Sequence, residues 1–381
     1  MRQKCMTKRL TLIILLLIVL FVPSASLQAQ QLAPDTETLQ KAKVLSVGTE
    51  SVVAAPGTSV PRKTQEIIVE VLSGVEKGSQ VSFVNDFTQL KKHDVFYLRH
   101  TTSPTEGKDY YTVADPYRLD VLLVLLALFI VLTIWVGGQQ GIRGLLSLTG
   151  SMLLIVYVLL PGIAAGYSPM LVAMGTASLV IIAGSYITHG VNRTTTAAVI
   201  GMIATVLLTG IAAGYAVSLA HLSGYSSEEI TYVYFNFNGT IDLVGLLLGG
   251  ILIGLLGVLY DSAIGQAIAV EELMRAGEHL SGREIFSRAM RLGREHIGAL
   301  VNTLAIAYVG AALPLLLLFS KTSAPIGYLL NAEILATEII RILIGSIGLI
   351  LAVPITTFIA VAVLSKYGLP ERKDVLHRHS H

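Results

Sequence analysis

The polar side chains inside the long apolar runs of this sequence are its candidates for chemistry. Four lie within or beside two such runs: Asp261, Gln266, Asn302 and Thr303. A polar group at membrane depth is costly unless it is paired or hydrated. Asp261 would lie roughly 28 Å along a helix from Asp242, near a membrane surface. Two interpretations of this carboxylate follow: the mouth of a cation or proton path, or an interfacial residue hydrogen-bonded to a neighbouring helix.

We expect Asp261 to form a hydrogen bond with Asn302, because both residues would lie at similar depth in adjacent helices. The alternative for Asn302 is a structural contact that holds two helices together, and Gln266 has the same two interpretations. On Asp261's own helix, small residues at helical spacing, including Gly254 and Gly265, predict a face that another helix can approach closely.

A second group of candidates lies near the C-terminus. Glu338 and Arg341 are three residues apart, so they can meet on one helix face, either as an entry gate or as a structural ion pair. Thr356 and Thr357 follow Pro354, and their hydroxyls could satisfy carbonyls that the proline frees. Broken helices often line transporter sites, but proline is also common in ordinary membrane helices.

No motif for catalysis is present. The sequence lacks a Walker loop, an HExxH zinc motif and a nucleophile elbow, and its one cysteine, Cys5, lies in the N-terminal segment. We therefore expect no enzyme activity, no cofactor and no metal. A net charge of +2 without a basic stripe also argues against binding to nucleic acid.

The composition indicates two parts. Hydrophobic residues make up 53% of the chain and charged residues 14%, against about 25% in soluble domains. The charge deficit begins after Tyr117. Residues 1–29 have a basic start and an apolar run, typical of a signal peptide, either cleaved or retained as an anchor.

Residues 30–116 are expected to form a small all-β domain outside the cytoplasm. Short runs with strand-like alternation are separated by turn-forming residues. This pattern favours a small barrel of OB-like or SH3-like type. The runs are Ala42–Val47, Glu66–Leu72, Gln80–Val84, Val95–Arg99 and Tyr110–Val113.

Residues 117–366 are expected to form an α-helical membrane bundle of about seven transmembrane helices, with residues 367–381 as a cytoplasmic tail. Each apolar run is near the length that crosses about 30 Å of hydrocarbon. The runs are Leu119–Val136, Leu145–Leu160, Met170–Ile187, Thr194–Leu219, Leu243–Ala269, Gly298–Phe319 and Ile342–Leu364.

Five arginines between Val270 and Ile297 predict the orientation. Short loops rich in Lys and Arg stay in the cytoplasm, so this loop and the C-terminal tail are predicted inside. Ser281 and Glu284 have capping-box spacing, which predicts a short helix along the inner leaflet. The segment Asn331–Arg341 is predicted to lie similarly on the outer surface.

Several strings of the membrane half resemble the bacterial YibE/F-like family of multi-pass membrane proteins. The resemblance covers nearly all of residues 117–366, and it is looser in the β-domain, where this chain has His93-Asp94 in place of a Gly-Asp turn. It implies an integral membrane protein and leaves the activity open. The strings are GVLYD at 257–261, QAIAVEEL at 266–273, REHIG at 294–298, VNTL at 301–304, EIIR at 338–341 and VPITT at 353–357.

Two functions fit these observations. The first is a permease or transport component of the cell membrane that moves a small ion or solute. The second is a membrane scaffold or regulatory subunit whose extracytoplasmic β-domain binds a protein partner. In both cases the lipid bilayer is the solvent of the C-terminal two-thirds.

Overall fold

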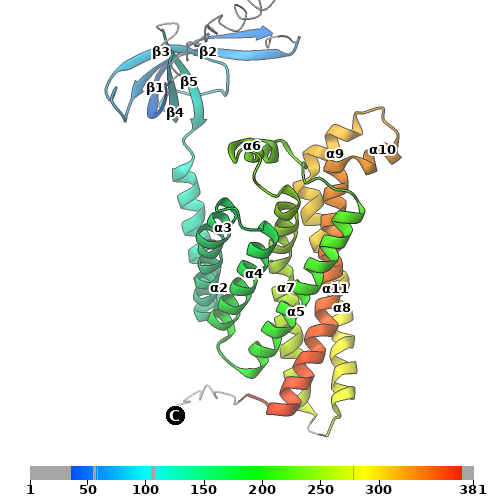
Figure 1. Cartoon of the computed structure of the whole chain (residues 1–381). Coiled ribbons are helices and arrows are strands. Elements are labelled where there is room, and N and C mark those ends of the chain that lie inside the picture. Colours follow the sequence, from blue (N-terminus) through cyan, green and yellow to red (C-terminus); the bar gives the residue numbers. More distant parts are fainter. Residues whose placement is uncertain (1–35, 55–56, 58, 104–107, 278, 371–381) are drawn as a thin grey trace, which may run out of the picture. The chain divides into compact units, whose positions relative to one another are not determined.

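A computed structural model describes residues 36–54, 57, 59–103, 108–277 and 279–370 (Figure 1). The chain divides into two compact units, one ending at Ala127 and the other beginning at Leu128. The predictions for residues 1–29 and for most of the tail, 371–381, lie outside the described residues.

The first unit contains one antiparallel sheet of five strands in the order β3-β2-β1-β4-β5. The strands are β1 (Thr36–Ala54), β2 (Pro61–Val71), β3 (Gln80–Asn85), β4 (Val95–Ser103) and β5 (Lys108–Pro116). All five predicted strands are therefore present, and β1 and β2 are much longer than predicted. The sheet curls, because its two outer strands, β3 and β5, also contact each other.

Alternating side chains build the core of this sheet. In β2 the residues Ile67, Val69 and Val71 are fully buried, while the intervening residues face outward. Period-two alternation places one set of side chains on one face of a strand. β1 and β4 add Val44, Phe96 and Leu98 to the same core.

The second unit is helical. Its elements, with the helix that leads into it, are α2 (Leu119–Leu154), a π-helical turn (Ile155–Leu159), α3 (Leu160–Ala164), α4 (Pro169–His189), α5 (Arg193–Leu219), α6 (Glu228–Asn236), α7 (Leu243–Ala276), α8 (Gly282–Ala311), α9 (Leu313–Ser320), α10 (Ile326–Asn331) and α11 (Glu333–Tyr367). Among the described residues, five helical stretches are long and apolar enough to cross a membrane, or six if the bent pair α8–α9 is one span.

The difference from the predicted seven arises at Gly138. The first two predicted spans lie in one helical stretch of 46 residues, Leu119–Ala164, which would be about 70 Å long if straight. Its backbone is not helical at Gly138 (φ 53°, ψ −134°). A Cβ atom on Gly141 would collide with the carbonyl of Thr133, so the chain reverses direction between them.

Two predicted interfacial helices are parts of longer helices. The capping box of Ser281 and Glu284 is confirmed, but the helix it begins runs unbroken through the arginine-rich segment to Ala311. The break comes later, with a 64° bend between α8 and α9 beside Pro314. Likewise, the predicted surface helix Asn331–Arg341 is wrong, because α11 runs from Glu333 to Tyr367 through Pro354.

Helices α5 and α11 pack along a seam of small residues. On α5, five buried residues recur every fourth position: Ala197, Gly201, Thr205, Thr209 and Ala213. They face Gly348, Ala352 and Thr356 on the antiparallel α11. An ideal Cβ on Gly348 would lie 2.6 Å from the hydroxyl of Thr209, and Thr356 fills the equivalent space over Gly201. Small residues at this spacing let helix backbones approach closely.

The connections of the bundle gather at two ends. At one end, Gln140 Nε2 donates to the carbonyl of Thr188, and Arg193 donates to that of Tyr367. We call this the Glu271 end, because Glu271 on α7 lies here and accepts from Thr194 at the start of α5. At the other, which we call the Glu333 end, the Glu333 carboxylate accepts from the backbone of Ser223 and Gly224 at 2.8 and 2.9 Å.

Candidate functional site

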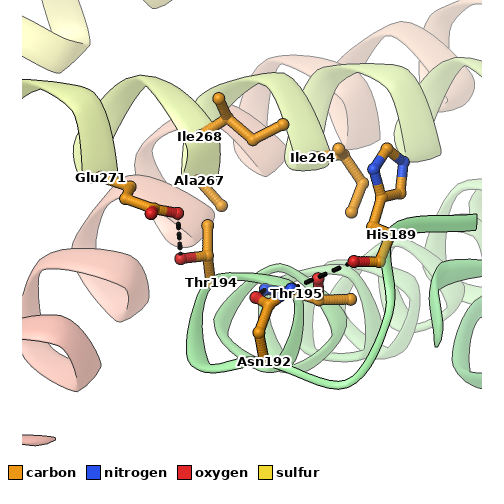
Figure 2. Close-up of a pocket in the computed structure, with 8 residues that line it drawn as sticks. All are labelled: His189, Asn192, Thr194, Thr195, Ile264, Ala267, Ile268 and Glu271. Atoms are coloured by element: carbon orange, nitrogen blue, oxygen red, sulfur yellow. Dashed lines mark hydrogen bonds between the residues drawn. The ribbon is translucent and has the colours of Figure 1, made fainter. Parts of the chain in front are cut away.

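A small cavity at the Glu271 end is lined by α4, α5, α7 and the turn between α4 and α5 (Figure 2). Its volume is about 120 Å³. That is well above the roughly 15 Å³ that one ordered water needs. Its walls combine polar and apolar side chains: His189, Asn192, Thr194, Thr195, Ile264, Ala267, Ile268 and Glu271.

Asn192 builds the turn that forms one wall. Its Oδ1 accepts from the backbone N–H of Thr195 at 2.8 Å and so caps the first turn of α5. Its Nδ2 donates at 3.1 Å to the carbonyl of His189, which is the last residue of α4. One side chain thus ties the end of α4 to the start of α5, and both bonds are drawn in Figure 2.

Glu271 supplies the carboxylate of the cavity. The hydroxyl of Thr194 donates to its Oε2 at 2.5 Å. Arg275, one helical turn further along α7, donates to its Oε1 from Nε at 3.0 Å and from Nη2 at 2.6 Å. The two side chains of this ion pair are 17% and 23% exposed, so they are only partly screened by solvent.

Arg275 also reaches the segment that follows α11. Its Nη2 donates to the carbonyl of Pro370 at 2.5 Å, and Arg193 donates to the carbonyl of Tyr367. Carbonyls at a helix C-terminus lack intrahelical donors and carry partial negative charge. Arg193 from α5 therefore holds the end of α11 beside the cavity, and Arg275 from α7 holds the segment that follows it.

None of the eight predicted site residues lines this cavity. Asp261 and Asn302 are both exposed, and within the described ranges neither side chain makes a hydrogen bond. The predicted Asp261–Asn302 bond is wrong, because these side chains are not in the α7–α8 interface. That interface instead contains Gly254 against Tyr308 and Gln266, whose Nε2 donates to the carbonyl of Ala289 at 2.8 Å.

The other predicted residues have structural partners. Thr303 is exposed, and its hydroxyl donates to the carbonyl of Ala299 at 2.9 Å within its own helix. Thr357 is buried and donates to the carbonyl of Val353 at 2.6 Å. Thr356 is buried in the α5–α11 seam, with no hydrogen-bond partner among the described residues. Neither threonine bonds the carbonyl of Ile350, which Pro354 frees, so that expectation is wrong.

Glu338 and Arg341 do meet. Arg341 Nη2 lies 3.5 Å from Glu338 Oε1, and the guanidinium lies 5.9 Å from the centre of the Tyr308 ring. The guanidinium Nε is buried without a partner in the described part of the chain. This pair lies toward the Glu333 end of α11, far along the helix from the cavity.

The β-domain holds a polar cluster that the sequence did not reveal. His100 lies between two carboxylates, with Nδ1 3.4 Å from Glu76 and Nε2 3.0 Å from Asp109. Its ring stacks on Tyr111 at a centroid distance of 4.5 Å. The hydrogen bond from His100 and a second one from Thr102 hold the pKa of Asp109 below its ordinary value. Glu76 comes from the β2–β3 loop, so only the fold brings these groups together.

Sequence reasoning also missed the cavity residues. Asn192 before a helical run is a recognisable N-cap signal, but Thr194 and Glu271 are 77 residues apart. Within the described ranges, no group of three or more His, Cys, Asp and Glu side chains is placed to hold a metal ion. The cavity therefore offers one carboxylate, two hydroxyls, one amide and one imidazole to a small polar guest.

Comparison with known proteins identifies the helical part. The family described as YibE/F-like protein matches residues 125–366, which include every element of the cavity. Neither the curated proteins nor the solved structures contain a match to this chain. The chain belongs to the YibE/F-like family.

Proposed function

We propose that this member of the YibE/F-like family is a membrane transport component that moves a small ion or solute through the Glu271 cavity. The observation that carries the proposal is a polar cavity between helices long and apolar enough to span a bilayer. Polar groups in such surroundings are costly unless they are paired or hydrated. A cavity that holds a polar guest explains why these polar side chains gather at the Glu271 end of the bundle.

The proposed arrangement in the membrane has seven crossings. The reversal at Gly138 divides Leu119–Ala164 into two spans, and α8 with α9 forms one bent span. With the arginine-rich start of α8 in the cytoplasm, the Glu271 end faces inward. The β-domain is then extracytoplasmic. We assign it an OB-like barrel, because β1 pairs with both β2 and β4, and β3 contacts β5.

Transport fits the cavity better than catalysis. The carboxylate of Glu271 is paired with Arg275 and a hydroxyl, and no serine or cysteine nucleophile lines the walls. Such a site is equipped to hold a small guest and release it. We therefore propose that this protein is not an enzyme.

The test is solute flux into proteoliposomes that contain the purified protein, over a panel of small ions and polar solutes. Glu271→Gln should lower flux about tenfold or more, since a hydrogen bond to a charged group contributes about 1.5–3 kcal/mol. Asp261→Asn is the matched control, because that carboxylate is exposed outside the cavity. Flux that falls in the control but not in Glu271→Gln would place the path elsewhere.

The alternative function is a scaffold or regulatory subunit whose β-domain binds a protein partner. The His100 cluster, built from three separate segments, is the feature of that domain that favours a specific surface. An absence of flux over the whole panel, together with co-purification of one fixed partner, would reject transport in favour of this role.

A further inference from the structure

Glu271 is shared between the cavity and an internal ion pair. One carboxylate oxygen faces the cavity wall through Thr194, and the other accepts two bonds from Arg275. Figure 2 draws the side of this carboxylate that faces Thr194. Because both oxygens belong to one group of a single negative charge, a second cation bound at Oε2 would repel the guanidinium bound at Oε1.

The cavity suits a small monovalent cation. Oxygen atoms of carboxylates, hydroxyls and amides are the ligands of hard cations. Glu271 is the one carboxylate in the walls, with hydroxyls of Thr194 and Thr195 beside it. A divalent cation normally takes more than one carboxylate, so a single charge matches an ion such as Na⁺.

Arg275 connects the same carboxylate to Pro370, which lies just after the end of α11. Its guanidinium holds Glu271 and the carbonyl of Pro370 at once, with Nη2 taking part in both contacts. The fork geometry of arginine lets one side chain hold both acceptors. If Glu271 turns to another cation, the position of Arg275 beside Pro370 loses its electrostatic support.

We propose that a monovalent cation in the cavity displaces Arg275 from Glu271 and thereby releases Pro370 and the short segment that follows α11. The inference deepens the proposed function, because it names the guest class and the element that responds. By linkage, release of this segment must in turn raise the affinity of the cavity for the cation. Arg193, which holds Tyr367, keeps the end of α11 in place, so the movement is confined to the residues after Tyr367.

The experiment measures the distance between spin labels at Ile200, which is exposed, and Pro370, which is half-buried, in Cys5→Ser protein reconstituted in nanodiscs. Ile200→Cys lies on α5, and Pro370→Cys keeps the backbone carbonyl that Arg275 holds. Replacing choline chloride by NaCl at constant ionic strength should shift the distance distribution. Arg275→Gln should show the shifted distribution without Na⁺, and Glu271→Gln should abolish the response to Na⁺.

Arg291→Gln is the control, since Arg291 is an exposed arginine on α8, and this variant should respond to Na⁺ as the parent does.

The absence of a Na⁺ or K⁺ response in the parent, together with a shifted distance distribution in Arg275→Gln, would overturn the cation site. An unshifted Arg275→Gln would overturn the coupling, and a response to Ca²⁺ alone would overturn the monovalent class. A response to Na⁺ without flux in proteoliposomes would support the cation site and reject transport. Flux without a response to any monovalent cation would support transport and reject the cation site.

Discussion

Gln65 holds the loop before β4 against the sheet with a single side-chain amide. Its Oε1 accepts from the backbone N–H of Leu90 at 2.9 Å, and its Nε2 donates to the carbonyl of the same residue at 3.3 Å. The side chain is 4% exposed and so lies within the domain core. The Gln65 amide pairs with both the backbone N–H and the backbone carbonyl of Leu90, as a neighbouring strand would. These two bonds hold Leu90 in the core of the domain.

Gln65→Met is expected to destabilise the β-domain by about 1–3 kcal/mol, because both backbone groups of Leu90 lose their partner while they remain buried. Pulse proteolysis of the full-length protein in detergent, at increasing urea, measures this change. Gln80→Met is the matched control at an exposed strand position, where a surface substitution changes stability by about 0.5 kcal/mol or less. Equal effects of the two substitutions would contradict a structural role for Gln65.

Asp109 should make the stability of the β4–β5 hairpin depend on pH. Its pKa in the folded protein is lowered, first by the hydrogen bond from His100 and then by that from Thr102. A lowered folded pKa contributes stability that is present above the unfolded value, near 3.8, and is lost as pH falls through the folded value. Hydrogen-exchange protection of the hairpin, corrected for intrinsic rates, should therefore be constant above about pH 5 and fall as the pH is lowered through 3.8 toward the folded pKa.

Asp109→Asn removes this titrating group and should flatten the pH dependence over that range. The Thr102 hydroxyl can still donate to the amide oxygen, so the geometry of the hairpin is retained. An unchanged pH dependence in Asp109→Asn would show that another group controls the acid transition.

Residue-level prediction from the sequence succeeded where partners are close along the chain. Glu338 and Arg341 lie one turn apart and meet as expected. It failed for Asp261, because helical spacing gives depth along a helix but not which neighbouring helix covers a face. The functional pairing of Thr194 with Glu271 depends on the packing of α5 against α7, which no local pattern encodes.

At the scale of elements, the α5–α11 seam holds the bundle together. Its hydroxyls at Thr209 and Thr356 lie over glycines of the opposite helix, where Cα–H groups can approach the oxygens. A Cβ at Gly201 would lie within 3.1 Å of Thr356 Cβ and closer still to its hydroxyl. The seam has no room for a larger side chain at this position.

Gly201→Val should destabilise the helical unit by about 1–3 kcal/mol through overpacking. Gly214→Val is the control on the same helix, because a Cβ there meets no atom within 4 Å. Both substitutions change helix propensity equally, so the difference between them isolates the seam. Reversible unfolding in mixed SDS micelles measures the difference, and equal losses would mean that α5 and α11 do not pack as described.

Element boundaries followed the sequence where a local signal exists. The capping box at Ser281 begins α8, and Pro314 lies at its bend into α9. The small residues at every fourth position of α5 from Ala197 were not among the predictions, and only the structure shows that they face α11. The continuity of α8 through the arginine-rich segment was not predicted either, because amphipathic and apolar stretches can share one helix.

At the scale of the whole molecule, the positions of the loops are consistent with the predicted alternation of sides. Segments predicted to be cytoplasmic share the Glu271 end, where Arg193 binds the last residue of α11 and Arg275 binds Pro370 just beyond it. Segments predicted to be outside share the Glu333 end, where the loop at Ser223 meets the start of α11. Helix packing and basic-residue asymmetry are independent features of the chain, so their agreement strengthens the proposed orientation.

That orientation predicts opposite accessibility for two exposed positions, Glu228 on α6 and Arg288 on α8. In a Cys5→Ser background, Glu228→Cys should react with a membrane-impermeant maleimide on intact cells that express the protein. Arg288→Cys should react only after permeabilisation, because arginine-rich loops are retained in the cytoplasm. Ser46→Cys in the β-domain is the control and should label like Glu228→Cys. Labelling of Arg288→Cys and Glu228→Cys from the same side would require an even number of crossings between them, whereas α7 alone separates their helices in the chain.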